Sequence, residues 1–330
     1  MKLALCFAIA IVMGAAVAAD GPKTPPNWHS GVGTSMLSDP EAAGAEAAAE
    51  AKAKLGGVPA KLVVIGAAEP QVTRALIRGV SEHFNETIIY GCQVTSPLTA
   101  AGNFPEVPTI DIPAGVCVWA LGGDVDIDVR WVATYQDDDD GYFNAGVALG
   151  ELLRPMAEET ERPGKIILTF GDQYNGTNKD FAAGFNEGLN RSSPIIGAAS
   201  GNITSKVIIR GEIQTGVNVG IFIGGQFTLG QSLNGGTHTP ETADRTLREA
   251  IAEGDGKEPF FALVFNCRRR RLGMIEHNQL GEELNAIKRN LPGIDFFGFY
   301  GPGEIGSKSF GATPEGVGFT VVAAVFFAEE

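Results

Sequence analysis

The sequence has little cysteine and little histidine. Its 330 residues include four cysteines and four histidines. The histidines are scattered without the HExxH spacing of a zinc protease, and no CxxC pair occurs. These absences argue against a disulfide-rich scaffold and against a structural metal site. We therefore expect no cofactor and no bound metal.

Positive charge is also scarce. Lysine and arginine together number 25 against 39 aspartates and glutamates, which gives a formal net charge of −14. A chain of this charge repels phosphate backbones, so we do not expect nucleic acid as a partner. Hydrophobic residues make up 44% of the sequence, which supports a packed core and argues against disorder.

The N-terminal segment MKLALCFAIAIVMGAAVAAD has the pattern of a secretory signal peptide. Lys2 precedes an uncharged apolar run at residues 3–17, and small residues stand before Asp20. The run is shorter than the roughly 20 residues that span a bilayer. We predict a signal peptide over residues 1–19 and an exported protein, periplasmic or secreted, without stable membrane insertion after cleavage. Three cysteines would remain, so at least one is unpaired.

The sequence repeats an order of strands and helices about one hundred residues apart. In the first copy, KLVVIGAA (61–68), a helix over 70–84, TIIYGC (87–92) and GVCVWALGG (115–123) follow one another. KIILTFGD, NKDFAAGFNEGL, PIIGAASGN and GVNVGIFIGG return in the same order in the second copy. Matched residues are 104, 106 and 102 positions apart (Lys61 to Lys165, Gly91 to Gly197, Gly123 to Gly225). Such constant offsets indicate an internal duplication.

A looser third copy closes the chain. It consists of PFFALVFNC (259–267), a helix over 274–291, IDFFGFYGPGEIG (294–306) and GVGFTVVAAVFFA (316–328). A helix precedes each copy, and in the first case Asp39 is a candidate N-cap with Pro40 at the first helical position. We predict an α/β class protein, a layered mixed-sheet fold built from about three α-β-α-β-β repeats. The strand pairs joined through LGGD and IGGQ are expected to form antiparallel hairpins.

Strands that end in glycine are the first candidate site. Gly91, Gly197 and the pair Tyr300-Gly301 stand at comparable places in the three copies. Ligands of open α/β sheets collect beyond the carboxyl ends of strands, and glycine lets the backbone approach a ligand closely. The alternative is that each glycine only turns the chain. Gly303 and Glu304 follow in the third copy, and the first two copies carry no acid at this place.

The run NCRRRR (266–271) is the second candidate site. Guanidinium groups bind carboxylates or phosphates with two parallel hydrogen bonds, and at most one or two of the four arginines can point into one pocket. The alternative is a solvated loop that faces the acidic run DDDD (137–140).

These two segments resemble the FIST domain family. FALVFNCRRRRLG followed by GFYGPGEIG resembles the FIST C-terminal domain, with a strand ending in cysteine, a nearby arginine and a Gly-Glu-Ile corner. GVGTSMLSDPEAAGAEAAAEA, VVIGAA and IIYGCQVTS resemble the FIST N-terminal region. The resemblance implies an N-terminal region over 20–236, with repeats at about 31–135 and 140–235, and a C-terminal domain over 237–330. Pro302 and the segment SKSFGATPEG depart from the family pattern.

The resemblance implies a sensory-type protein that binds a small ligand such as an amino acid, without catalysis. Gly91, Cys92, Cys267, Arg270, Gly303 and Glu304 match the family motifs by position, and Gly197 and Tyr300 join them through the repeat. In this hypothesis Arg270 holds a carboxylate and Glu304 holds an ammonium group. An exported chain of this kind would need a separate signalling partner protein.

Two other hypotheses remain open. A cysteine-dependent hydrolase or transferase could use Cys92 or Cys267 as nucleophile, although no histidine stands at a recognisable motif position and buried unreactive cysteine is commoner. Asp124, Asp126 and Asp128 share one face of a predicted strand and could bind calcium, although a solvated face is the simpler interpretation.

Overall fold

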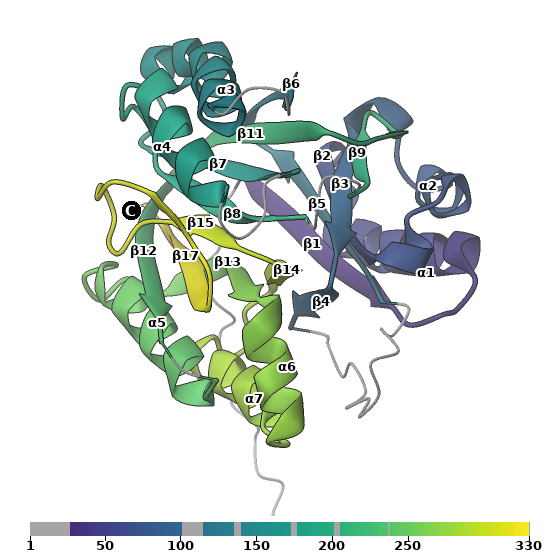
Figure 1. The fold of residues 1–330 in the computed structure, drawn as a ribbon. Helices are drawn as coiled ribbons and strands as arrows, with labels where there is room; N and C mark the ends of the chain where they lie inside the picture. Colours follow the sequence, from purple (N-terminus) through teal and green to yellow (C-terminus); the bar gives the residue numbers. More distant parts are fainter. Residues whose placement is uncertain are drawn as a thin grey trace, which may run out of the picture.

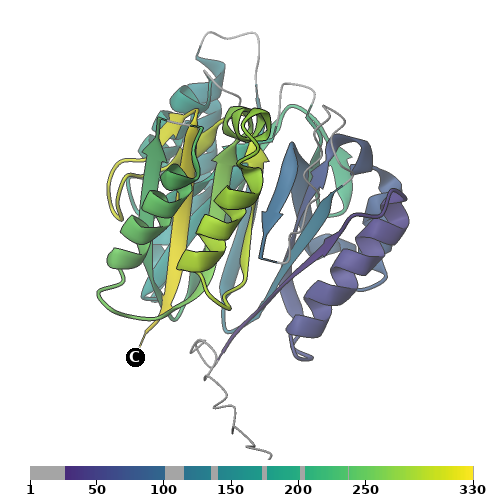
Figure 2. The ribbon, with the colours of Figure 1, turned by 90° about the horizontal axis from the view of Figure 1, so that it is seen from below.

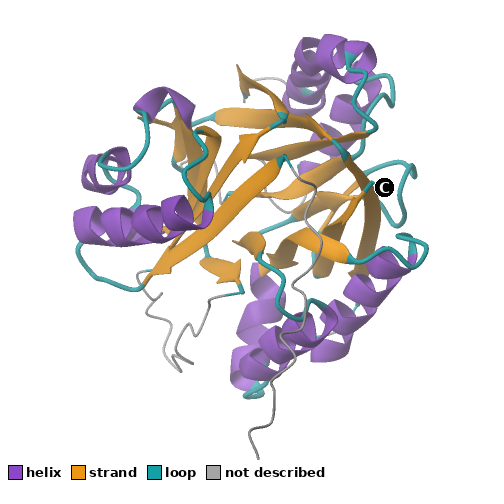
Figure 3. Cartoon of the chain, turned by 180° about the vertical axis from the view of Figure 1, so that it is seen from behind, coloured by secondary structure: helices purple, strands orange, loops and turns teal. Residues whose placement is uncertain are grey.

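The computed structural model describes residues 27–100, 115–134, 140–172, 177–200, 205–236 and 238–329. The predicted signal peptide lies outside these residues. Strands occupy the middle of the molecule and helices lie around them in three groups (Figure 1, Figure 3). Each group of helices covers one β-sheet, and we call each sheet with its helices a lobe.

The three sheets share one strand order. The first lobe contains β1 (Trp28–Ser35), β5 (Val116–Gly123), β2 (Ala60–Ala68) and β3 (Ile89–Val94). The second contains β6 (Asp126–Ala133), β11 (Val217–Gly225), β7 (Gly164–Gly171) and β8 (Ile195–Ala199). The third contains β12 (Phe227–Gly235), β17 (Thr320–Ala328), β13 (Pro259–Cys267) and β14 (Phe296–Gly301). The last two strands of each series are parallel and the others antiparallel, so the predicted mixed α/β fold is confirmed.

Each sheet is extended by strands that belong to another lobe. After β3 the chain crosses to the third lobe, where β4 (Ser96–Thr99) pairs with β14. After β8 it crosses to the first lobe, where β9 (Val207–Ile209) pairs with β3 and with β10 (Glu212–Gln214). After β14 it crosses to the second lobe, where β15 (Glu304–Gly306) pairs with β8 and with β16 (Glu315–Val317). The three lobes are therefore linked in a closed cycle of exchanged strands.

The helices cover the outer faces of the sheets, as Figure 2 shows for α1 and for the green helices of the third lobe. They are α1 (Pro40–Lys54) and α2 (Arg74–Ser81) in the first lobe, α3 (Gly141–Glu159) and α4 (Asn178–Gly188) in the second, and α5 (Pro240–Ala252), α6 (Arg268–Glu276) and α7 (Leu280–Asn290) in the third. Two 3-10 turns lie at Glu69–Gln71 and Glu86–Ile88. None of the helices in the described part of the chain is long and apolar enough to cross a membrane.

The hydrophobic core has one central cluster and three outer clusters. The central cluster joins inward-facing residues of all three sheets, and each outer cluster lies between one sheet and its helices. Trp119 of the first lobe stacks on Phe261 and Phe297 of the third, with ring centroids 5.1 and 5.6 Å apart. Apolar burial at the centre therefore couples the lobes to one another.

Local signals in the sequence explain several helix ends. Asp39 caps α1 and its side chain accepts a hydrogen bond from the Ala42 amide at 2.8 Å, while Pro40 is the first helical residue. Gly56 follows the helix with φ +62°, a conformation that glycine adopts easily. The predicted cap and its proline are confirmed.

Two predictions about elements were wrong. The strands joined by LGGD, β5 and β6, lie in different sheets and do not pair, and the same holds for β11 and β12 around IGGQ. The arginine run, for which a solvated loop was one of two interpretations, forms the first turn of α6. A single predicted helix over 274–291 is divided between α6 and α7, where Asn278 has φ +54°.

Three glycines allow parallel strands to approach each other closely. A Cβ atom added at Gly91, Gly197 or Gly298 would lie 2.3, 1.8 or 1.6 Å from a carbonyl oxygen of the neighbouring strand. The strand register places Gly298, rather than Tyr300-Gly301, in the slot of Gly91 and Gly197. All three are inside strands, so they serve strand packing rather than a turn.

Candidate functional site

Cys267 stands where β13 ends and α6 begins. It is the N-cap residue of α6, with φ −77° and ψ 131°, and its side chain makes no regular capping hydrogen bond. Burial raises the pKa of the thiol, the negative charge of Glu304 raises it further, and the nearby backbone amides of Phe319, Arg269 and Arg270 lower it. The thiol is therefore held mainly protonated.

Glu304, at the start of β15, is fully buried. Its Oε2 accepts hydrogen bonds from the Thr320 hydroxyl at 2.6 Å and the Thr320 amide at 3.3 Å. Its Oε1 has no regular hydrogen-bond partner among the described residues. Burial raises the pKa of Glu304 to about 8, against the opposing effects of the Thr320 hydrogen bonds, the Arg270 charge and the Cys267 thiol. The carboxyl is thus neutral near pH 7.

Arg270 is part of a buried polar network. Its guanidinium donates to Asn266 Oδ1 at 3.1 Å, to the Thr239 carbonyl at 3.1 Å and to Glu283 at 2.5 Å. Glu283 also accepts a hydrogen bond from the Tyr300 hydroxyl at 2.8 Å. The side chains of Arg270 and Glu283 are both completely buried. A guanidinium engaged in this way fastens α6 to α7 and β14.

Arg271 is the next residue of α6, and its side chain has a different environment. The residue is only 6% exposed, yet its guanidinium makes no ion pair or hydrogen bond with the described residues. Its guanidinium carbon lies over the Tyr300 ring, 5.9 Å from the ring centroid. Burial lowers the pKa of Arg271. Arg271 and Tyr300 line a cavity of about 40 Å³ together with Ser96 and Pro97 of β4 and Leu284 of α7.

The other predicted site residues are distributed over the three lobes. Gly303 lies in the corner itself, packed against the Asn178 side chain, which donates to the Glu304 carbonyl at 3.1 Å. Gly197 pairs with Ile305, so β8 lies beside this corner. Gly91 and Cys92 lie in β3 of the first lobe, where Cys92 is part of the central core. Burial raises the pKa of the Cys92 thiol well above its ordinary value.

The aspartates considered for calcium bind a cation of the chain itself. Arg162 forms ion pairs with Asp124 at 2.6 Å and Asp126 at 2.9 Å, and Asp128 pairs with Arg130 at 3.0 Å. Within the described residues no three side chains of the metal-ligating types gather in one place. Residues 137–139 of the acidic run lie outside the described residues.

Residues 177–307 match the family model described as the FIST C domain. This segment of the chain is therefore similar to a FIST C domain. The match begins just before α4 and ends just after β15, so it spans parts of the second and third lobes and includes Cys267, Arg270, Tyr300 and Glu304. The resemblance seen in the C-terminal motifs is confirmed, whereas the N-terminal region and the domain boundaries stay predictions.

Other comparisons add less. A solved structure described as a cyanuric acid hydrolase is 11% identical and covers 92% of this chain and 100% of its own, with a TM-score of 0.49. A likeness at that level carries no statement about activity. None of the curated proteins compared with the chain matches it.

Three residues near Cys267, Arg270 and Glu304 were missed in the sequence. Arg271 was not separated from Arg270, although the RRRR run was singled out. Glu283 and Thr320 carry no motif signal of their own. If the run is taken as helical, Arg270 and Arg271 point about 100° apart around the helix axis. This difference in direction could have separated the two arginines from the sequence alone.

Proposed function

We propose that this protein is a sensory-type module that binds a small ligand, and that Arg271 holds the anionic group of that ligand. The observation that carries the proposal is an arginine residue that is 6% exposed, lacks an ion-pair partner among the described residues and lines a cavity. The FIST C domain supports the sensory, ligand-binding class.

The charge of Arg271 has no opposite charge beside it. A buried charge is unfavourable unless another group pairs with it, and arginine does not lose its proton in proteins. Arg270 has found its partner in Glu283, and Arg271, one residue further, has not. A carboxylate entering from outside would complete the pair with two parallel hydrogen bonds.

The cavity limits what can enter. One water needs about 10–15 Å³ in this measure, so a cavity of about 40 Å³ holds roughly three waters or one carboxylate group. The ligand therefore places only its anionic end beside Arg271. An amino acid or a similar small carboxylate fits this description, with the Tyr300 ring as one wall.

Binding is better supported than cysteine catalysis. Burial raises the pKa of Cys92, of Cys117 (to about 12) and of Cys267, and a nucleophilic cysteine needs the thiolate. The N-cap position of Cys267 works in the opposite direction but does not overcome burial. We further propose that the protein acts after export and passes its signal to a separate partner protein.

The test compares two arginines of one helix. Arg271→Gln removes the charge that faces the cavity, and Arg268→Gln removes an exposed charge from the same turn of α6. Titration calorimetry with a panel of amino acids and short carboxylates should give at least tenfold weaker binding for Arg271→Gln and unchanged binding for Arg268→Gln.

The thermal stability of the same two variants is a second test. Removing an unpaired buried charge should leave the Tm of the ligand-free protein unchanged or raise it, whereas a structural arginine would destabilise the protein when removed. A panel without any bound member, or equal affinities in both variants, would contradict the proposal.

A further inference from the structure

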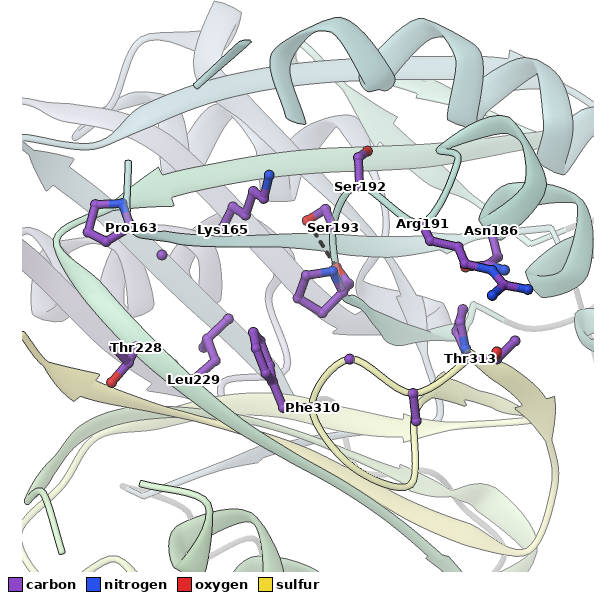
Figure 4. A pocket seen from close by; sticks show the side chains of 15 residues that line it. Pro163, Lys165, Asn186, Arg191, Ser192, Ser193, Thr228, Leu229, Phe310 and Thr313 are labelled. Carbon is purple, nitrogen blue, oxygen red and sulfur yellow. Dashed lines mark hydrogen bonds between the residues drawn. The ribbon is translucent and has the colours of Figure 1, made fainter. Parts of the chain in front are cut away.

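A larger cavity, separate from the one beside Arg271, lies at the amino ends of β7 and β8 (Figure 4). Its volume is about 400 Å³, within the usual range of small-molecule sites. Four segments enclose it: the start of β7, the turn between α4 and β8, the start of β12 and the loop 310–314. It shares no residue with the cavity beside Arg271.

The lining carries positive charge only. Lys165 and Arg191 are the charged residues among the fifteen that line the cavity, although the whole chain has a net charge of −14. Figure 4 places Lys165 on one side and Arg191, next to Asn186, on the other. The Lys165 ammonium donates to the Ala157 carbonyl at 2.5 Å, which leaves two of its three donors for a ligand. Opposed cations without an acid favour an anion.

The turn that carries Arg191 has two further features. Asn190 and Arg191 have φ angles of 52° and 58°, and arginine rarely adopts this left-handed conformation. The hydroxyl of the next residue, Ser192, is buried without a hydrogen-bond partner in the described part of the chain. A hydroxyl so buried does not reach the cavity, so Arg191 is the polar group of this turn that a ligand would meet.

The opposite wall is apolar. Phe310 is 52% exposed and stands at the mouth of the cavity in Figure 4, near Leu229. Its loop is held in place, because the Phe310 amide donates to the Glu253 carboxylate at 3.0 Å and the Ser307 hydroxyl donates to the Ala312 carbonyl at 2.9 Å. A large aromatic side chain held at a cavity mouth offers a surface for an apolar or aromatic group.

We propose that this cavity is a second binding site, which takes a small organic anion with an aromatic or apolar body. Lys165 and Arg191 hold the anionic group, and Phe310 with Leu229 contacts the body. The site is independent of the one proposed around Arg271.

Calorimetry with benzoate, 3-phenylpropionate and naphthalene-2-sulfonate tests the site, with the neutral 3-phenylpropionamide as the uncharged counterpart. We expect at least one of the three anions to bind. The amide should bind at least fivefold more weakly than 3-phenylpropionate.

Two variants and two controls locate the binding. Arg191→Gln and Phe310→Ser should each weaken binding at least fivefold. Lys308→Gln, on the same loop as Phe310 but outside the cavity, should leave it unchanged, and so should Arg271→Gln. Circular dichroism confirms folding, since both altered side chains are largely exposed.

Three results would overturn this inference: no binding of any of the three anions, equal affinity in Arg191→Gln, or loss of binding in Arg271→Gln. The last result would assign the anions to the other site. Failure of the Arg271 proposal would leave the behaviour of Arg191→Gln as expected here, so the two proposals fail separately.

Discussion

At the scale of single residues, the Glu304 carboxyl is a group whose charge depends strongly on the fold. Burial raises its pKa from 4.5 to about 8, so the folded protein holds a proton that the unfolded chain releases above pH 4.5. Stability from this group is complete below pH 4.5 and is lost as the pH rises through about 8. Between the two values the folded state binds more protons, and the free energy of unfolding falls with pH.

This sign gives a pH prediction for Glu304→Gln. Gln keeps the acceptor for Thr320 but does not titrate. Between the two pKa values the free energy of unfolding of the wild type should fall by up to about 1.4 kcal/mol per pH unit, and this fall should be absent from the variant. Urea unfolding from about pH 5 to about pH 9 measures it, with the half-buried Glu315→Gln as control. Equal pH profiles for wild type and Glu304→Gln would show that the carboxyl is ionised in the folded protein.

The two neighbouring arginines show where the sequence stops being informative. The run RRRR drew attention to this part of the chain, and the Gly-Glu-Ile corner drew attention to Glu304. Which guanidinium is paired depends on Glu283 and Tyr300, which α7 and β14 bring to Arg270. Such partners are set by tertiary packing, and no local pattern encodes them.

At the scale of elements, the parallel strand pairs depend on glycine. A methyl group at Gly91, Gly197 or Gly298 would meet a neighbouring carbonyl oxygen at 2.3, 1.8 or 1.6 Å, so the strands would have to separate. We predict that Gly298→Ala lowers the free energy of unfolding by about 3 kcal/mol or more, and that Gly197→Ala and Gly91→Ala follow in decreasing order.

Chemical denaturation measures this series, and Gly293→Ala is the control. Gly293 has φ +72° and open space around it, so Gly293→Ala should lower the free energy of unfolding by only about 1–2 kcal/mol, through backbone strain. A Gly298→Ala variant as stable as Gly293→Ala would mean that the sheet adjusts without loss.

Element types were predictable and their pairing was not. Apolar runs and caps located β2, β7, β13 and α1, because burial and hydrogen bonding act over a few neighbouring residues. The LGGD and IGGQ segments looked like hairpin turns, yet they carry the chain from one lobe to the next. The short strands β4, β9 and β15 escaped prediction as exchanged strands, because three or four residues hold too little pattern.

At the scale of the whole molecule, the exchanged strands and the shared central core make the lobes interdependent. Isolation of the third lobe as residues 226–330 would remove β4 from β14 and expose its face of the central cluster. We predict that the full chain unfolds in one transition and that this fragment does not fold.

Calorimetry and near-ultraviolet circular dichroism check both statements. The full chain should give coincident transitions by both methods, and the fragment should give no cooperative transition. A fragment that melts cooperatively would establish the third lobe as an autonomous domain.

The cycle of exchanged strands also has a consequence for the order of events during synthesis. Pro97 of β4 pairs with Phe299 of β14, so the first lobe offers a strand whose partner leaves the ribosome about 200 residues later. At the usual rates of about 5–20 residues per second, β4 waits at least about 10 seconds. Until then the edge of β14 does not exist, and β4 is free to pair with other chains. Contacts of such long range make folding slow and late, with the ring closed only after the last lobe has emerged.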